Sequence, residues 1–210
     1  EKVDSIVIMG IGEPLANYRE VLRFIRLCHE PYCLNMSYRN ITLSTSGLAP
    51  AIRQLAEEKI PITLAISLHA ANDALRSRLM PVNHTYPIEQ LLNAADYYAD
   101  QTGRRVTYEY LLIAGINDAA QHAKELARLL RKRLAAVNLI PVNPVPERGW
   151  TRPADKTIQE FEATLQTCGV EVLKYLQVDQ ILTGGREYTD AKLAEIMGFI
   201  GLTSFPHNCL

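Results

Sequence analysis

Hydrophobic residues along this chain occur in two alternating patterns, short apolar runs and longer stretches with helical spacing. The short runs predict strands at residues 4–9, 40–44, 62–67, 105–113, 136–141 and 170–176. Apolar residues that repeat every three or four positions predict helices at 17–28, 50–58, 73–79, 88–101, 119–134 and 157–168. The first run, Ser5 to Met9, lacks polar alternation and therefore predicts a strand that is buried on both faces.

Strands that alternate with helices indicate parallel strands joined by helical crossovers. The sequence therefore predicts an α/β fold, a parallel (βα) barrel that is open or closed, with a doubly wound sheet as the rival. No Gly-x-Gly-x-x-Gly turn follows a predicted strand, so the dinucleotide-binding fingerprint is absent.

Composition is that of a soluble globular domain. The 210 residues carry a formal net charge of -1, and 48% of them are hydrophobic, so the chain can bury a sizeable core. No apolar run approaches the roughly 20 residues that a membrane-spanning helix needs. The cysteines follow neither a disulfide framework nor a zinc pattern, which predicts free thiols and a cytoplasmic location; they are Cys28, Cys33, Cys168 and Cys209.

The near-zero net charge argues against attraction of the whole molecule to nucleic acid. A local basic face remains open, and solvated helix ends are the alternative interpretation of the same residues. The residues concerned are Arg104, Arg105, Arg128, Arg131, Lys132 and Arg133.

Compact polar side chains follow successive predicted strands. The most prominent are the carboxylate of Glu13, the hydroxyls of 44–46, the imidazole of His69 and the amide of Asn143. Because the carboxyl ends of parallel strands lie at one rim, where ligands bind, we expect these groups to converge. A carboxylate suits an ammonium group, while hydroxyls and amides suit a carboxylate or ribose hydroxyls. The pattern predicts a site for a zwitterionic ligand that carries a ribose.

Each of these groups also has a purely structural interpretation. Glu13 and the Ser44 and Ser46 hydroxyls could cap the helices that follow them, and His69 could be a hydrogen-bonded structural histidine. Asn143, which stands between two prolines, could only shape a turn.

The sequence does not decide the roles of several other polar residues. Asn117-Asp118 has the sequence of a helix cap before Ala119. Glu109 lies inside a predicted strand, and the alternation of its neighbours does not decide which face it takes. Arg76 and Arg78 would hold a phosphate or a carboxylate, or would lie in solvent.

Six segments together carry a family resemblance. They are Gly10-Ile11-Gly12-Glu13-Pro14-Leu15, Ile41-Thr42-Leu43-Ser44-Thr45-Ser46-Gly47, Leu64-Ala65-Ile66-Ser67-Leu68-His69-Ala70, Arg76 with Met80-Pro81-Val82-Asn83, Tyr108-Glu109-Tyr110, and Val137-Asn138-Leu139-Ile140-Pro141-Val142-Asn143-Pro144. In this order they resemble the radical SAM 23S rRNA adenine-C2 methyltransferases, the RlmN/Cfr group. The match runs from about residue 3 to about residue 172.

This resemblance implies a fold and cofactors. It implies a partial parallel (βα) barrel of the radical SAM type, with the first strand missing, over residues 1–172. In the family the barrel holds a [4Fe-4S] cluster and S-adenosylmethionine (SAM). The SAM contacts that carry over are Gly12, Glu13, Ser44, Ser67, Leu68, His69 and Asn143.

The resemblance also implies an activity and partners. One SAM methylates a cysteine of the enzyme, a second is cleaved to a 5′-deoxyadenosyl radical, and the methyl carbon is added to C2 of an adenosine in 23S rRNA. Many members also act on a tRNA adenosine. A reductant protein such as flavodoxin or ferredoxin serves the full-length enzyme.

Two departures separate the sequence from the family pattern. The CxxxCxxC loop that supplies three thiolates to the cluster is absent. The Ala-Cys-Gly-Gln-Leu motif that carries the methylated cysteine is absent too, and Cys209 lacks that context. We therefore expect an N-terminal truncation, a divergent or frameshifted tail at 173–210, no catalytic residue and no metal ligand in this chain, and no activity of the chain alone.

Two other functions remain as alternatives. One is a cluster-free module that binds SAM or another nucleotide. The other is a non-radical (βα) enzyme such as an aldolase, which would need a lysine or paired catalytic carboxylates at the strand ends. No lysine stands there, so the aldolase is the weaker alternative.

Overall fold

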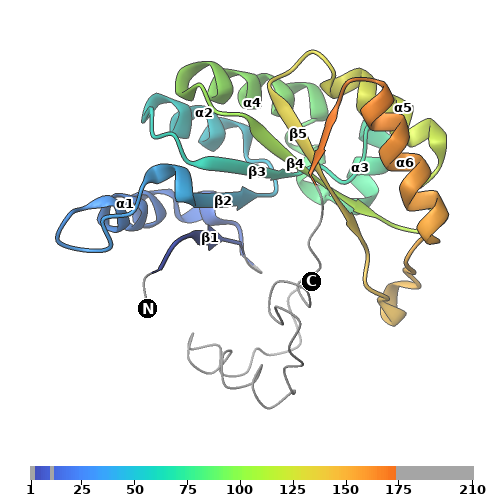
Figure 1. Cartoon of the computed structure of the whole chain (residues 1–210), viewed down its shortest axis with the longest axis horizontal. Helices are drawn as coiled ribbons and strands as arrows, with labels where there is room; N and C mark the ends of the chain where they lie inside the picture. The colour runs from blue at the N-terminus through green and yellow to red at the C-terminus, as the bar shows by residue number, and fades with distance from the viewer. Residues whose placement is uncertain (1–2, 10–11, 174–210) are drawn as a thin grey trace. The chain divides into compact units, whose positions relative to one another are not determined.

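A computed structural model describes residues 3–9 and 12–173 of the chain. Six strands form one parallel sheet, and their spatial order follows their order in the chain (Figure 1). They are β1 Ile6–Ile8, β2 Ile41–Thr45, β3 Thr63–Ser67, β4 Val106–Leu112, β5 Ala135–Pro141 and β6 Glu171–Leu173. A doubly wound sheet would change direction at a switch point, so the consecutive order excludes that rival and confirms the partial parallel barrel.

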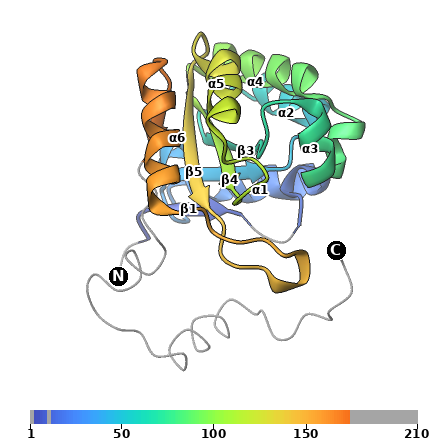
Figure 2. The same cartoon turned by 90° about the vertical axis from the view of Figure 1, so that its right-hand side faces the viewer.

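Helices connect the strands, close to the predicted positions. They are α1 Tyr18–His29, α2 Ala49–Glu57, α3 Asp73–Leu79, α4 Ile88–Thr102, α5 Ala120–Leu130 and α6 Asp155–Thr167. Short 3-10 helices add η1 Pro14–Asn17, η2 Tyr38–Asn40, η3 Pro81–His84 and η4 Pro146–Arg148. Figures 1 and 2 show α2, α4 and α5 gathered on one side of the sheet.

The sheet face that packs against the helices is almost entirely apolar. Alternate strand residues supply it, among them Leu43 on β2, Leu64 and Ile66 on β3, and Tyr108 and Tyr110 on β4. Each of these side chains is at most 1% exposed. Removal of this area from water supplies the main driving force for folding of the unit.

The opposite face, here called the open face, is polar. Residues in register on neighbouring parallel strands point to the same side of the sheet. One register row joins Ser44, Ala65 and Thr107, and the next joins Ser67, Glu109 and Asn138. Glu109 therefore lies on the open face, opposite to its neighbours Tyr108 and Tyr110, which settles the question that the sequence left open.

The prediction that the first strand is buried on both faces is wrong. Ile6 and Ile8 pack against the core, but Val7 and Met9 are each 57% exposed. Within the described residues β1 pairs only with β2, so Val7 lies at the edge of the open face with no strand beyond it. A continuous apolar run does not reveal whether a strand is central or at an edge.

Helix α5 ends at Leu130, four residues before the predicted end. A turn follows, and Arg133 donates from Nε to the carbonyl of Leu129 at 2.9 Å. Arg133 also forms an ion pair with Asp96, and Arg105 forms one with Glu171.

These contacts show that the basic residues between 104 and 133 do not all face solvent as one surface. Arg128, Arg131 and Lys132 are exposed. No helix in the described part of the chain is long and apolar enough to cross a membrane.

The expected domain boundary after residue 172 falls within β6, the last described strand. Residues 174–210, which include Cys209, lie outside the described residues, and so do Gly10 and Ile11 of the first motif.

Candidate functional site

Glu13 follows β1 and ties the ends of the first two strands together. Its Oε1 accepts hydrogen bonds from the amide of Leu15 at 3.0 Å and the hydroxyl of Thr45 at 2.8 Å. Its Oε2 accepts the amide and the hydroxyl of Ser46 at 2.7 and 2.6 Å. A carboxylate offers about four acceptor positions, so all of them are filled by the protein. Glu13 caps η1, as its structural interpretation predicted.

A second carboxylate, Glu109 of β4, joins the next strands. The hydroxyls of Ser44 on β2 and Ser67 on β3 both donate to Glu109 Oε2 at 3.1 Å. Ser44 and Glu109 are 8% and 6% exposed, so this contact lies beneath the rim of the sheet. The interpretation of Ser44 and Ser46 as helix caps is wrong, because the cap residue of α2 is Leu48 and no side chain bonds there.

His69 lies just beyond β3 in a left-handed backbone conformation with φ of 58°. Only a small fraction of non-glycine residues adopt this region, and at sites where they do the surrounding structure must hold them. The amide of His69 donates to the carbonyl of Glu109 at 3.2 Å. Its own carbonyl accepts from Asn117 Nδ2 at 2.8 Å. Both sides of the strained residue are therefore fixed to β4 and the loop after it.

Asn117 is completely buried and is not a helix cap, which corrects the sequence-based interpretation. Its amide group donates to the carbonyls of His69 and Leu111 and accepts from the amide of Ile113 at 2.7 Å. The carboxamide satisfies backbone groups where β4 ends, since a buried polar group without a partner is costly. The residue joins the loops after β3 and β4.

The hydrogen bonds of His69 define its tautomer. The backbone amide of Leu111 can only donate, and it lies 3.1 Å from His69 Nδ1. Nδ1 must therefore be the acceptor, and the proton of the neutral ring resides on Nε2. Burial, with the nearby Arg76 charge as the smaller cause, lowers the pKa of His69 to about 4. At neutral pH the ring offers one N–H donor in a fixed position.

Arg76 of α3 is fully buried, contrary to both sequence-based interpretations. Its guanidinium donates to the carbonyls of Ser46 at 2.8 Å, Ser67 at 3.1 Å and Leu68 at 3.2 Å. A fourth bond goes to Asn83 Oδ1 at 2.9 Å. Burial lowers the pKa of Arg76 to about 10, still far above neutral pH, so the group stays charged. Arg76 holds the backbone of the two loops that follow β2 and β3.

The remaining predicted SAM contacts lie at the same edge but are less connected. Leu68 is buried, and its amide donates to the carbonyl of Glu109 at 3.0 Å. Gly12 is exposed, and a Cβ there would meet nothing within 4 Å in the described structure. Asn143 is exposed in the loop after β5, which projects beyond the strand in Figure 2, and no hydrogen bond joins it to the other predicted contacts.

The described residues contain no group of three or more His, Cys, Asp or Glu side chains that could hold a metal ion. Cys28 lies on the buried face of α1, whereas Cys33 and Cys168 are exposed, and all three are free thiols. The donor set of this part of the chain therefore does not fit a [4Fe-4S] cluster, which needs thiolates. The polar open face does fit an organic ligand with several donors and acceptors.

Three residues of this site could not be assigned to it from the sequence: Arg76, Glu109 and Asn117. One signal could have placed Glu109. Tyr108 and Tyr110 flank it, and two aromatic residues at alternate positions favour the core face, which leaves the residue between them on the other face. No local pattern distinguishes a buried arginine or asparagine from an exposed one.

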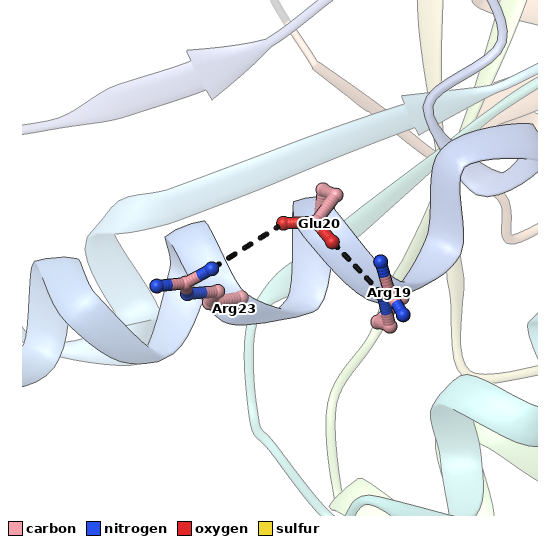
Figure 3. A network of polar contacts seen from close by, with 3 residues as sticks. All are labelled: Arg19, Glu20 and Arg23. Atoms are coloured by element: carbon pink, nitrogen blue, oxygen red, sulfur yellow. Dashed lines mark hydrogen bonds and ion pairs between the residues drawn. The ribbon is translucent and has the colours of Figure 1, made fainter.

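A separate groove rich in arginine lies along α1. It has a volume of about 540 Å³ and is lined by side chains that include Tyr18, Arg19, Arg23, Arg26 and Tyr32. Acids accompany these arginines, since Glu58 pairs with Arg26 and Glu30 also lines the groove. Figure 3 shows that one acid of the same helix, Glu20, contacts both Arg19 and Arg23. All three of these side chains are more than 40% exposed, so their ion pairs are worth little and are easily exchanged for a ligand.

The sheet order, the polar strand ends and the helix-covered opposite face define the class of protein. A family model described as the radical SAM superfamily matches residues 1–130. The chain belongs to the radical SAM superfamily.

More specific likenesses concern RNA methyltransferases. The chain is 46% identical over 196 residues to a probable dual-specificity RNA methyltransferase RlmN of Carboxydothermus hydrogenoformans, covering 93% of this chain and 57% of the relative. It is 53% identical over 171 residues to the protein of the same description from Symbiobacterium thermophilum, covering 81% and 46%. The chain spans about half the length of the curated relatives it matches.

A solved structure agrees with this likeness. The crystal structure of a radical SAM methyltransferase from Sphaerobacter thermophilus superposes with a TM-score of 0.80 at 48% identity. The superposition covers 82% of this chain and 51% of that one. The fold and about half of the sequence are therefore those of an RlmN-like segment.

Proposed function

We propose that this chain is the SAM-binding part of an RNA methyltransferase that methylates C2 of an adenosine in 23S rRNA and in tRNA. The observation that carries the proposal is the linked set of polar groups at the strand ends, on a segment about half identical to RNA methyltransferases. Such RNA substrates would place the reaction in the cytoplasm.

The SAM contacts in this proposal are Gly12, Glu13, Ser44, Ser67, Leu68, His69 and Asn143. Their roles differ. Glu13, whose carboxylate is already filled, positions the backbone of Ser46 and Leu15 around the ligand. The Nε2–H of His69 donates to an acceptor of the ligand, and Asn143 adds an exposed amide from the opposite side of the rim. SAM bound there would supply the methyl group.

The iron–sulfur cluster of the family has no fitting set of ligands in residues 3–9 and 12–173. We therefore derive no step through it. A cluster, and a reductant such as flavodoxin or ferredoxin, would act together with segments other than those described.

RNA is the proposed macromolecular partner, and the groove on α1 suits it. Arginine side chains recognise phosphates, and exposed tyrosine rings stack on unpaired bases. Arg19, Arg23 and Arg26 recur along one helix, and Tyr32 beside them is 78% exposed. The short helix η1 connects Glu13 to the first turn of α1, so RNA bound at the Tyr18 end of this groove would lie near the SAM site.

Together these proposed contacts at the carboxyl ends of the strands form what we call the SAM cradle. Calorimetric titration of the chain with SAM, without iron, tests whether it binds SAM. The proposal predicts saturable binding that Ser67→Ala weakens by about fivefold or more, because one hydrogen bond is worth about 1 kcal/mol. Thr63→Ala, on the same strand and face but at the amino end, should leave SAM affinity unchanged. No binding by the wild-type chain, or equal affinities for all three proteins, would contradict the proposal.

A segment exchange tests the methyltransferase assignment. Residues 3–172 would replace the matching segment of the Symbiobacterium thermophilum relative, and mass spectrometry of digested rRNA and tRNA would detect 2-methyladenosine. We expect methylation by the exchanged protein and none from its Ser67→Ala, His69→Ala double variant. A folded exchanged protein that binds SAM yet methylates neither RNA would overturn the assignment.

A second candidate, a cluster-free SAM-binding module, is favoured by one observation, the missing metal-ligand set among the described residues. The calorimetric result separates the two. Tight SAM binding without iron would favour the module, and weak binding would favour the methyltransferase, in which the cluster normally adds to the affinity.

A further inference from the structure

Within the described residues, three hydrogen bonds hold His69 in its left-handed conformation, and one of them comes from a side chain. The amide of His69 donates to the carbonyl of Glu109 at 3.2 Å, and its Nδ1 accepts from the amide of Leu111 at 3.1 Å. Both partners are backbone groups of β4, which is paired with β3 and β5. The third bond runs from Asn117 Nδ2 to the carbonyl of His69 at 2.8 Å. Asn117 is therefore the partner of His69 whose contribution a substitution can remove.

Asn117 is enclosed by the protein and does not itself face a ligand. It is 0% exposed. Its Nδ2 donates to the carbonyls of His69 and Leu111 at 2.8 and 2.6 Å, and its Oδ1 accepts from the amide of Ile113 at 2.7 Å. Its own carbonyl accepts from the hydroxyl of Tyr110, a residue of the apolar core, at 2.9 Å. A continuous series of hydrogen bonds thus leads from the core through Asn117 to His69.

The bond from Asn117 determines where the ring proton of His69 points. The Glu109 carbonyl holds the peptide group before His69, and Asn117 holds the peptide group after it, so together they fix φ and ψ of the residue. A residue with a side chain keeps a left-handed conformation only where its surroundings impose it. With the backbone fixed and Nδ1 occupied by the Leu111 amide, the Nε2–H donor has a single direction.

We propose that Asn117 is a positioning residue for SAM binding, which aims the Nε2–H of His69 at the ligand by holding the His69 carbonyl. This inference rests on the proposed role of His69 in the SAM cradle. It adds a residue from the loop after β4, which the predicted contact set lacked. A preorganised donor loses less freedom when the ligand binds, so its hydrogen bond contributes more to the affinity. By linkage, bound SAM must in turn stabilise the bond between Asn117 and His69.

A double-mutant cycle between His69 and Asn117 tests the proposal, with SAM affinity measured by calorimetry on the whole chain. Asn117→Ala alone should weaken SAM binding about fivefold, the equivalent of one misdirected hydrogen bond. In the His69→Ala background the same substitution should change the affinity by about twofold or less, because no ring is left to aim. Equal losses in the two backgrounds would mean that Asn117 acts on the fold alone, and would overturn the proposal.

Tyr98→Phe is the matched control. Tyr98 is also fully buried, and its hydroxyl donates to two backbone carbonyls, those of Ile60 and Ile62 at the amino end of β3. The substitution should lower the urea midpoint of unfolding but leave SAM affinity unchanged. If Tyr98→Phe weakened SAM binding as strongly as Asn117→Ala, the loss would follow from lower stability and the proposal would be wrong.

The wild-type chain provides a test that needs no variant. NMR detects the side-chain amide protons of Asn117, and saturating SAM should slow their exchange with solvent several-fold, because bound SAM stabilises the bond that protects them. Unchanged exchange with SAM bound would overturn the proposal even if Asn117→Ala does not fold. A wild-type chain that binds SAM without this coupling would refute the role of Asn117 and leave the cradle intact, whereas a chain that does not bind SAM would refute both.

Discussion

Ile66 and Ser67 are neighbours in β3, yet they belong to the two opposite faces of the sheet. Ile66 is fully buried in the apolar core beneath the helices, whereas Ser67 donates to Glu109 on the open face. The same alternation places Leu43 of β2 and Tyr108 of β4 in the core and their neighbours Ser44 and Glu109 on the open face. Because successive side chains of a strand point in opposite directions, one short segment serves stability with one set of residues and ligand binding with the other.

The comparison also shows where the two roles meet. The polar face is held in place by a layer that is itself buried, chiefly Arg76 and Asn117, which bond the carbonyls of the strand-end loops. Substitutions should therefore separate into three groups: those that affect stability, those that affect binding, and those in this layer that affect both.

The largest loss of stability should come from substitution of Arg76, in the buried layer that supports the polar face. Arg76→Met removes the donor from four acceptors, the carbonyls of Ser46, Ser67 and Leu68 and Oδ1 of Asn83. We expect a loss of about 4 kcal/mol in the free energy of unfolding, measured by urea denaturation. Arg78→Met, exposed two residues later, should change it by less than about 0.5 kcal/mol. Similar values for the two variants would contradict the assigned role of Arg76.

The two faces are compared directly by Ile66→Ala and Ser67→Ala. Ile66→Ala should lower the free energy of unfolding by about 3 kcal/mol, because it leaves a cavity in the core. Ser67→Ala should cost about 1 kcal/mol or less in stability but should weaken SAM binding. Denaturation and calorimetry on the same two proteins check this. A Ser67→Ala variant as unstable as Ile66→Ala would mean that the open face is a second structural core.

Acid should weaken the site through His69. Its pKa is about 4 in the folded chain and 6.5 when unperturbed, so between these values the unfolded state binds more protons and stability falls as pH falls. Between pH 7 and 4 the wild-type chain should lose about 2 kcal/mol more than His69→Gln does, after allowance for partial exposure. His84→Gln, an exposed histidine, should behave like the wild type. Parallel pH curves for wild type and His69→Gln would contradict the buried neutral tautomer.

The smallest effect concerns the loop after β2. Gly47 has a φ of 112°, and a Cβ there would lie 3.0 Å from Leu91 Cδ1 and 3.2 Å from Arg76 Nη2. Gly47→Ala should cost about 1–2 kcal/mol in thermal or urea unfolding. Gly12→Ala, where the space is open, should change stability by less than about 0.5 kcal/mol. The reverse order would show that the loop is not constrained by Arg76.

Much of the architecture could be predicted from the sequence, because it depends on local periodicity. The six strands, the six α-helices and the shared polar edge follow from apolar spacing and from the geometry of parallel strands. The edge position of β1 could not be predicted, because an apolar run such as Ser5 to Met9 has the same composition whether or not a second strand covers it.

The details of the site depend on contacts between distant residues and were predicted less well. Asn117 has the sequence of a helix cap, but its amide group bonds to His69, which is 48 residues away. Arg76 reaches the carbonyl of Ser46 across 30 residues. Glu13 was correctly placed at the rim, yet only the structure shows that its carboxylate is already saturated and that Glu109 is not.

The central claim is that the polar carboxyl ends of the strands form a cradle for SAM. Amide chemical shifts of the ¹⁵N-labelled chain, recorded as SAM is added, test it most directly. The account predicts saturable shifts at Ser46, Gly47, Leu68 and His69, with no change at Thr63, Val106 and Ala135 at the amino ends of the strands. Shifts confined to those amino ends or to the groove on α1, or no shifts at millimolar SAM, would contradict it.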